Sequence, residues 1–262
     1  MLTKRLVVAA ILLPLLYAYI MYLSPYYFLL LMFVAAFICV EEFLLMYGVR
    51  DLTRHVFSAV SLIPLYMTYE YNEIPDYVFV TIFAVCVVVR LFERKGPENA
   101  LSDIAPFIVG LLYIPLCLSY FIKLRAIGQE AVMFLMLVTW GADSAALYVG
   151  KAIGRRKLYE SISPNKTVEG AIAALIGGGA SAVILKIGFN LNVDYLAIIG
   201  VGIVIGVFGI IGDLVESMFK RERSIKDSGS FLPGHGGLLD KVDGMLLCAP
   251  VLYYIVVLRQ YG

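Results

Sequence analysis

The sequence predicts an all-α protein that crosses a membrane several times. Its 262 residues are 61% hydrophobic and 16% charged, with a mean hydropathy of +0.88. A soluble domain is typically about 45–50% apolar and about 25% charged. The apolar stretches are unbroken and do not alternate every second residue, which excludes the strands of a membrane barrel. These observations together predict helices surrounded mainly by lipid.

Apolar runs of about 17 to 25 residues recur along the chain, and a helix of that length crosses a hydrocarbon core of roughly 30 Å. We predict nine spans, at residues 6–23, 27–46, 55–69, 77–92, 104–123, 131–150, 169–189, 195–219 and 243–260. The first is interpreted as a helix and not as a signal peptide, because Ser24-Pro25-Tyr26-Tyr27 is no small-residue cleavage site. Residues 1–130 are assigned to N-terminal transmembrane helices, and residues 131–262 to a catalytic transmembrane region with two polar cytoplasmic loops.

The positive charges predict how the chain is oriented, because cytoplasmic loops of membrane proteins are rich in Lys and Arg. If the N-terminus is cytoplasmic and nine helices cross, all but four of the 21 Lys and Arg residues fall on the cytoplasmic side. The four exceptions are Lys123, Arg125, Lys186 and Arg259. We therefore predict a cytoplasmic N-terminus, a C-terminus on the opposite side, and a location in the inner membrane of a prokaryote.

Several features have a packing explanation. The four cysteines lie in apolar spans without a CxxC or Cys/His pattern, which argues against disulfides and structural zinc. They are Cys39, Cys86, Cys117 and Cys248. The run Gly177-Gly178-Gly179 is typical of membrane helices that approach closely, and we expect it to serve packing.

Carboxylates near the cytoplasmic ends of two predicted helices point to chemistry in the second half of the chain. Asp143 lies in the sixth predicted span, and Asp213 and Glu216 lie in the eighth. A carboxylate inside an apolar span is costly unless it is paired or bound to metal. The alternative is a side chain that reaches water or pairs with a loop arginine, and it applies most to Glu216. Glu41 and Glu42 are expected to face a cavity or an interface, without a chemical role.

The loop after the sixth span contains five cations, one of which, Lys166, lies in the run Ser163-Pro164-Asn165-Lys166-Thr167. The cations alone could hold anionic lipid headgroups, at about 1 kcal/mol each. That alternative leaves Ser163, Asn165 and Lys166 unexplained. These residues offer donors just before a helix whose N-terminal N–H groups also attract anions. We interpret the loop as a phosphate site, and it lacks the spacing of a Walker A loop.

The segment 217–243 is the most densely charged part of the chain. Asp240 and Asp243 are three residues apart at a helix start, so both face one side and repel each other unless a cation lies between them. Asp213 and Asp227 could complete an oxygen ligand set for Mg²⁺, and a second metal ion is left open. A solvated first helical turn is the alternative for the pair.

Glycines in the same segment allow backbone N–H groups to approach phosphate, and we assign Gly236 and Gly237 to this role. For His235 two interpretations stay open, a phosphate contact and a structural hydrogen bond.

The segment 217–243 resembles the signature of the phosphatidate cytidylyltransferase family, also called CDP-diacylglycerol synthases. The matching positions are Ser217, Phe219, Lys220, Arg221, Lys226, Asp227, Gly229, Leu232, Pro233, His235, Gly236, Gly237, Leu238, Asp240, Val242 and Asp243. Lys241 stands where the family usually has arginine. The earlier loop resembles the family in Asp143, Tyr148, Gly150, Lys151, Gly154, Ser163-Pro164-Asn165-Lys166-Thr167 and Glu169-Gly170. The resemblance covers residues from about 139 to 250.

The resemblance implies that CTP and phosphatidic acid give CDP-diacylglycerol and pyrophosphate, in a homodimer without a nucleic-acid partner. A phosphate monoester is already an anionic nucleophile, so the reaction needs charge neutralisation and in-line positioning more than a Ser/His/Asp triad. The metal ligands are then Asp213, Asp227, Asp240 and Asp243. The substrate-binding residues are Ser163, Asn165, Lys166, Lys220, Arg221, Gly236 and Gly237. Further catalytic roles fall to Asp143, Lys226, Asp227 and His235.

Three other functions are weighed against this one. A CTP-dependent polyprenol or phytol kinase would transfer the γ-phosphoryl group instead. A CDP-alcohol phosphotransferase shares the opening Asp240-Lys241-Val242-Asp243-Gly244, but its Ala-Arg and its later paired aspartates are absent. An ion-coupled transporter could also place carboxylates in membrane helices, but no inverted repeat is evident.

Overall fold

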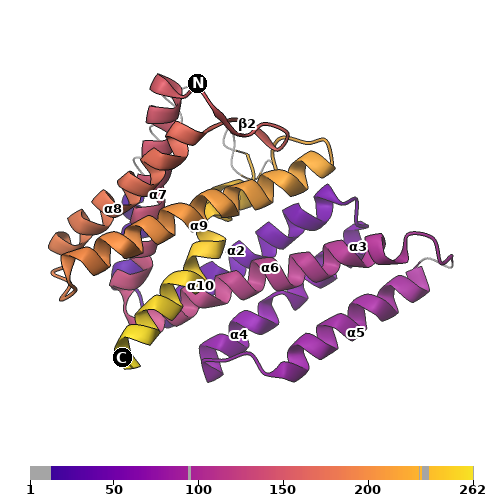
Figure 1. Cartoon of the computed structure of the whole chain (residues 1–262). Helices are drawn as coiled ribbons and strands as arrows, with labels where there is room; N and C mark the ends of the chain where they lie inside the picture. The colour runs from indigo at the N-terminus through magenta and orange to yellow at the C-terminus, as the bar shows by residue number, and fades with distance from the viewer. Residues whose placement is uncertain (1–12, 94–95, 230, 232–235, 262) are drawn as a thin grey trace. The chain divides into compact units, whose positions relative to one another are not determined.

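The computed structural model describes residues 13–93, 96–229, 231 and 236–261 (Figure 1). In this part of the chain, six helices are long and apolar enough to cross a membrane. They are α2 (Pro25–Met46), α6 (Ala100–Ile127), α7 (Gln129–Ile153), α8 (Val168–Gly188), α9 (Tyr195–Glu222) and α10 (Leu239–Tyr261). The only strands among the described residues form one short hairpin. The predicted class of an all-α, multi-pass membrane protein is therefore confirmed.

The predicted span at residues 55–69 is not one helix. It consists of α3 (Asp51–Val60) and α4 (Leu62–Tyr71), which meet at Ser61. Pro64 explains the interruption, because proline has no N–H to donate to the carbonyl four residues earlier and its ring crowds that carbonyl. Each helix has 10 residues, about half the length needed to cross a hydrocarbon core.

Two further predicted spans are helical but are not among the six long apolar helices. The span at residues 77–92 corresponds to α5 (Asp76–Glu93), which contains charged residues at both ends. In the first span, Leu13–Tyr22 forms an apolar helix, while residues 6–12 lie outside the described part. Nine crossings and the sides on which the termini lie thus stay predictions.

Contacts divide the chain into two compact units, each of which is described by itself. Among the described residues, unit one contains 13–22, 124–226 and 240–261, and unit two contains 23–93, 96–123, 227–229, 231 and 236–239. The predicted division at residue 130 concerns function and stays a prediction.

In unit one, α8 packs against both α7 and α9 (Figure 1). Small residues make this close approach feasible. A Cβ added to Gly178 would touch the backbone carbonyl of Gly202, and a Cβ added to Gly206 would lie 2.9 Å from the carbonyl oxygen of Ala174. The packing role predicted for Gly177-Gly178-Gly179 is confirmed for this helix pair.

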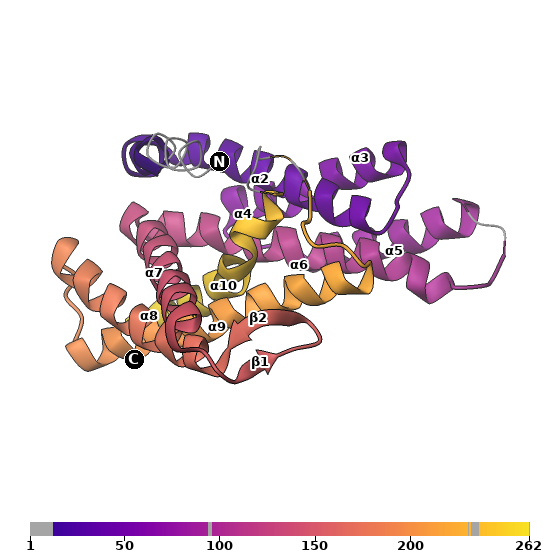
Figure 2. The same ribbon diagram turned by 90° about the horizontal axis from the view of Figure 1, so that it is seen from above.

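An antiparallel hairpin of β1 (Lys157–Tyr159) and β2 (Ser163–Thr167) connects α7 to α8 (Figure 2). Thr167 caps α8, because its hydroxyl accepts a hydrogen bond of 3.1 Å from the N–H of Gly170. The carboxylate of Glu169 accepts the backbone N–H groups of Arg155 at 3.0 Å and Arg156 at 3.3 Å. The polar loop before α8 therefore contains an ordered hairpin, which the sequence analysis did not predict.

In unit two, α2 packs against α3 and α4. Glu41 near the end of α2 pairs with two side chains of α3, at 2.6 Å from Nε of Arg54 and 2.5 Å from Nδ1 of His55. The Phe57 and Phe107 rings lie 4.6 Å apart between centroids, which joins α3 to α6. The pair Glu41–Arg54 keeps a partly buried charge compensated beside this apolar contact.

Candidate functional site

Three helices of unit one meet at small residues. A Cβ on Gly209 of α9, or on Gly244 of α10, would lie 3.7 Å from Cγ2 of Thr139 on α7. A Cβ on Gly212 would lie only 2.5 Å from the backbone oxygen of Asp243. Since glycine has no Cβ, α9 and α10 approach until their backbones are nearly in contact.

This meeting point brings three carboxylates together. Asp143 follows the α7 contact by one helical turn, Asp213 follows the α9 contact by one turn, and Asp243 directly precedes the α10 contact. Asp143 interacts electrostatically with Asp213, and Asp243 interacts with both. Asp243 also accepts a hydrogen bond of 2.8 Å from the N–H of Gly244. Three predicted site residues from three helices thus lie in one neighbourhood.

Lys166 of the hairpin reaches the same neighbourhood. Its Nζ lies 2.6 Å from Oδ2 of Asp213, and Ser217 Oγ donates to Oδ1 of Asp213 at 3.3 Å. The Lys166 side chain keeps 24% of its surface accessible and that of Asp213 keeps 39%. The predicted phosphate loop and the predicted metal ligand Asp213 are therefore in direct contact, and the Lys166 side chain is partly accessible to solvent.

Lys220 forms a second, more deeply buried ion-pair network. Its Nζ lies 2.7 Å from Oδ1 of Asp240 and forms an ion pair with Glu216, one turn earlier in α9. Glu216 is 1% exposed and Lys220 is 9% exposed. The alternative that Glu216 reaches water or pairs with a loop arginine does not hold, because Glu216 is buried and its partner is this lysine of the same helix. The Glu-to-Lys spacing of four residues is the sequence signal that would have found the pair.

We call this set of charged side chains the acid–lysine cluster. It comprises Asp143, Lys166, Asp213, Glu216, Lys220, Asp240 and Asp243. The cation expected beside Asp240 and Asp243 is the Lys220 ammonium in this structure, since it pairs with Asp240 and interacts electrostatically with Asp243.

The carboxylates of the cluster are candidate ligands for Mg²⁺, which prefers oxygen donors. Within the described residues, no three Asp, Glu, His or Cys side chains are arranged to hold one metal ion. Neither Asp143 nor Asp243 has a cation within ion-pair distance in that same part of the chain. Mg²⁺ commonly binds one or two carboxylates, with waters and substrate phosphates as its other ligands. The donors fit such a shared site and not an all-protein cage.

The other predicted binding residues of unit one lie around the hairpin. Ser163 is half-buried and Asn165 is exposed, both on β2, and Lys226 is exposed beyond α9. Arg221 has two structural contacts: its Nε donates to the carbonyl of Ile162 at 3.1 Å, and Nη1 donates to that of Ile225 at 2.9 Å. Arg221 therefore ties the turn of the hairpin to the end of α9.

The remaining predicted site residues belong to unit two or lie outside the described part. Asp227 is exposed, and His235 lies outside the described residues. Gly236 has φ of +87°, a backbone conformation that favours glycine. Gly237 is buried, and a Cβ there would press on the side chains of Glu42 and Ser228. The backbone conformation at Gly236 and the lack of space at Gly237 therefore each favour glycine, whether or not these residues bind phosphate.

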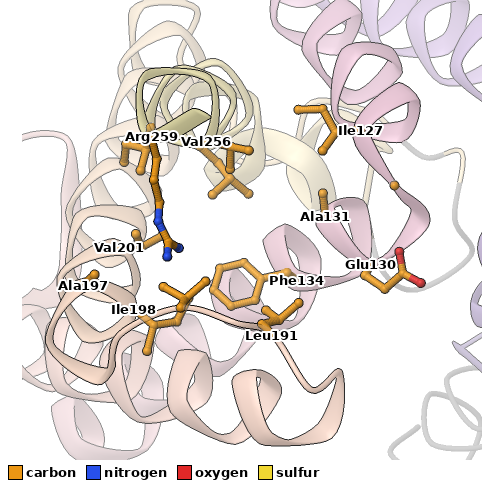
Figure 3. A pocket seen from close by; sticks show the side chains of 14 residues that line it. Ile127, Glu130, Ala131, Phe134, Leu191, Ala197, Ile198, Val201, Val256 and Arg259 are labelled. Atoms are coloured by element: carbon orange, nitrogen blue, oxygen red, sulfur yellow. The ribbon is translucent and has the colours of Figure 1, made fainter. Parts of the chain in front are cut away.

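An apolar cavity in unit one lies away from the acid–lysine cluster. It measures about 580 Å³ and is lined mainly by apolar side chains such as Phe134, Ile198 and Val256. Figure 3 shows Arg259 extending toward Phe134 and Ile198, with Glu130 on another side of the cavity. Its residues come from the start of α7, the start of α9 and the end of α10, the helix ends opposite to those that carry the cluster. An apolar cavity of this kind suits hydrocarbon and not a triphosphate.

Comparison with known proteins gives one consistent family. The sequence model of the cytidylyltransferase family matches residues 3–259. A phosphatidate cytidylyltransferase of Bacillus subtilis is 36% identical over 182 residues, which is 68% of each chain. One of Staphylococcus haemolyticus is 32% identical over 234 residues, 87% of this chain and 89% of the relative. These matches confirm the resemblance predicted from segment 217–243. The chain therefore belongs to the cytidylyltransferase family.

Proposed function

We propose that this chain is a phosphatidate cytidylyltransferase, which converts CTP and phosphatidic acid into CDP-diacylglycerol and pyrophosphate. Relatives that carry this name cover most of the chain. The observation that carries the proposal is the acid–lysine cluster at adjacent ends of α7, α9 and α10. Lysines and carboxylates at a membrane-helix end suit a reaction between a nucleotide in water and a phosphate on a lipid.

The chemistry asks the protein for charge control. A phosphate oxygen of phosphatidic acid attacks the α-phosphorus of CTP, a new P–O–P bond forms, and the bond from the α-phosphorus to the β-bridging oxygen breaks. The electron pair of that bond leaves with pyrophosphate. Both reactants are anions, so bringing them together requires nearby cations and in-line alignment. In this proposal Lys166 and Lys220 neutralise phosphate oxygens, and the side chain of Lys166 is the more accessible of the two.

We propose Mg²⁺ as the metal, held by Asp213, Asp240 and Asp243, directly or through water. When bound, the ion neutralises charge on the triphosphate and the incoming phosphate. In this scheme Lys166 and Lys220 leave Asp213 and Asp240 for phosphate oxygens when substrate arrives. Asp143 shapes the wall of the site. Asp227 as a further ligand, His235 as a phosphate contact and a second metal ion rest on the family signature.

The deciding experiment uses purified protein in detergent micelles with phosphatidic acid and CTP labelled in either the α- or the γ-phosphate. We expect α-label in the lipid product and γ-label in pyrophosphate. A polyprenol-type kinase would instead place γ-label in a lipid and release CDP, and a phytol or polyprenol substrate serves as the comparison. Ion flux in proteoliposomes without nucleotide turnover would identify a transporter.

We further propose that the acid–lysine cluster faces the cytoplasm of a bacterial inner membrane and that the chain forms a homodimer. The first part is supported by the positive charges of the flanking segments, and the second by the family resemblance. Light scattering of the purified protein, corrected for bound detergent, distinguishes a dimer from a monomer.

A further inference from the structure

Glu42 is a buried carboxylate in unit two that the proposed reaction does not use. It lies in α2 and is 6% exposed. A charge in an apolar helix is costly unless hydrogen-bond donors surround it. Its donors come from the segment 228–239, which lies about 190 residues further along the chain and belongs to the same unit.

The contacts of Glu42 reach both ends of this segment. Ser228 Oγ donates to Oε2 at 3.2 Å near the beginning of the segment. At its end, the N–H of Leu238 donates to Oε1 at 3.0 Å and the N–H of Leu239 donates to Oε2 at 2.9 Å. The carboxylate of Glu42 therefore binds Ser228 at one end of the segment and Leu238 and Leu239 at the other.

Leu239 is the first residue of α10. The first N–H groups of a helix have no acceptor within the helix, and a negative charge beside them is stabilised by the helix dipole. Glu42 thus caps α10 from another helix. Asp240 follows Leu239 directly and Asp243 lies one turn further along, so the cap defines where the helix that carries both carboxylates begins.

Two glycines leave room for this carboxylate. A Cβ on Gly229 would lie 2.6 Å from Glu42 Oε1, and a Cβ on Gly237 would collide with Oε2 and with Ser228 Oγ. Any side chain at either position would push the carboxylate away from its donors. The three atoms nearest to a Cβ at Gly229 all belong to Glu42.

We propose that Glu42 is a positioning residue for cytidylyl transfer. Its carboxylate holds Ser228 and the start of α10 in place. Through them it positions the predicted phosphate-binding Gly236 and Gly237 and the predicted metal ligands Asp240 and Asp243. Glu42 does not touch the reacting atoms. The inference rests on the proposed function for its kinetic part, and on the hydrogen bonds alone for its structural part.

The test is Glu42→Gln, with Glu41→Gln as the matched control. Glutamine keeps the shape of the side chain, but its NH₂ group faces an N–H or O–H donor and cannot accept from it. Glu41 is a suitable control because its described contacts are with α3 side chains. We expect kcat with CTP to fall at least about tenfold in Glu42→Gln, and the KM for phosphatidic acid to change less than about twofold. Glu41→Gln should keep kcat within about twofold.

Hydrogen exchange provides a readout that needs no substrate. The amides of Leu238 and Leu239 should exchange faster in Glu42→Gln, while amides of α7 to α9 keep their rates. Gly229→Ala displaces the carboxylate without removing it and should give the same kinetic and exchange changes if Glu42→Gln does not fold.

Faster exchange with unchanged kcat would mean that Glu42 is only structural and would overturn the proposal, as would unchanged exchange in both variants. If the wild-type protein transfers no CMP to phosphatidic acid, the proposed function fails. The exchange data then still decide whether Glu42 holds the segment.

Discussion

Lys220 and Lys166 illustrate how two lysines in one site differ in what they contribute. Lys220 is 9% exposed and lies between Glu216 and Asp240. Removing it takes the ion-pair partner away from the buried Glu216 carboxylate, which typically costs roughly 3–5 kcal/mol. We therefore expect Lys220→Ala to unfold at a much lower temperature or SDS concentration than wild type, and Glu216→Gln in the same chain to recover part of the loss.

Lys166 is the matched contrast, because its ion pair with Asp213 is partly open to solvent. Lys166→Ala should change stability by less than about 1 kcal/mol and lower kcat/KM for CTP strongly. Equal destabilisation by both substitutions would contradict the difference in burial on which this expectation rests.

Asp243 and Asp227 test the proposed metal ligands, one in each unit. Asp243→Ala and Asp227→Ala should each lower turnover by more than about a hundredfold, because charge stabilisation at the reacting phosphates is lost. Both variants should still insert into membranes and elute as a single species in detergent. Activity near that of wild type in either variant, measured across a range of Mg²⁺ concentrations, would remove that residue from the metal site.

Single residues also show where sequence reasoning reaches its limit. Asp143 and Asp213 could be singled out because an acidic side chain inside an apolar span is costly unless it is paired. Asp243 could be singled out through its spacing of three residues from Asp240. Glu216 could have been assigned through its spacing to Lys220. Glu42 could not, because its donors are mainly backbone N–H groups from the far end of the chain, and no local pattern encodes such a tertiary contact.

At the scale of helices, the crossing of α9 and α10 depends on Gly212. A Cβ there meets the backbone oxygen of Asp243 at 2.5 Å, so Gly212→Ala must shift α10 and the carboxylate that it carries. We expect a loss of about 1–3 kcal/mol in stability. We also expect at least a tenfold loss of activity, because a small displacement of the Asp243 carboxylate from its productive position slows the reaction.

Gly200 is the control for this substitution, because it lies in the same helix with nothing within 4 Å of an added Cβ. Gly200→Ala should leave activity unchanged and raise stability slightly, by at most about 1 kcal/mol, through helix propensity. Comparable activity losses at both positions would show that the helix backbone, and not the contact with α10, is what the substitution disturbs.

The helices themselves were largely predictable, and the exceptions have physical causes. Long apolar runs predicted α2 and α6 to α10, because length and hydropathy are properties of the local sequence. Pro64 divides the third predicted span, a signal that a count of apolar residues ignores. The hairpin was missed because β2 is Ser163–Thr167, a polar segment without the alternation that marks a strand.

At the scale of the whole chain, charge distribution and chemistry agree. The acid–lysine cluster lies at the helix ends next to the predicted cytoplasmic loops, whereas the apolar cavity with Arg259 lies at the opposite ends of the same helices. A polar site at a helix end suits an enzyme that joins CTP to a lipid phosphate. CTP is confined to water, and the acyl chains of the lipid are confined to hydrocarbon, so the two meet at the membrane surface.

The number and direction of the crossings can be measured by cysteine labelling in sealed inverted and right-side-out vesicles. The native cysteines Cys39, Cys86, Cys117 and Cys248 are buried and should give little background. Ser161→Cys, at the hairpin turn, should react with a membrane-impermeant maleimide only from the cytoplasmic side. Asn190→Cys, between α8 and α9, should react only from the other side.

Labelling at two further positions distinguishes nine crossings from fewer. If α3–α4 and α5 each cross, Asn72→Cys reacts from the non-cytoplasmic side and Glu98→Cys from the cytoplasmic side. Reaction of both from the cytoplasmic side would mean that neither crosses, which the short lengths of α3 and α4 make a concrete alternative. In that case the sides of Ser161 and Asn190 stay as predicted, because α3–α4 and α5 together contribute an even number of crossings. The cytoplasmic side proposed for the acid–lysine cluster therefore does not depend on whether these helices span the membrane.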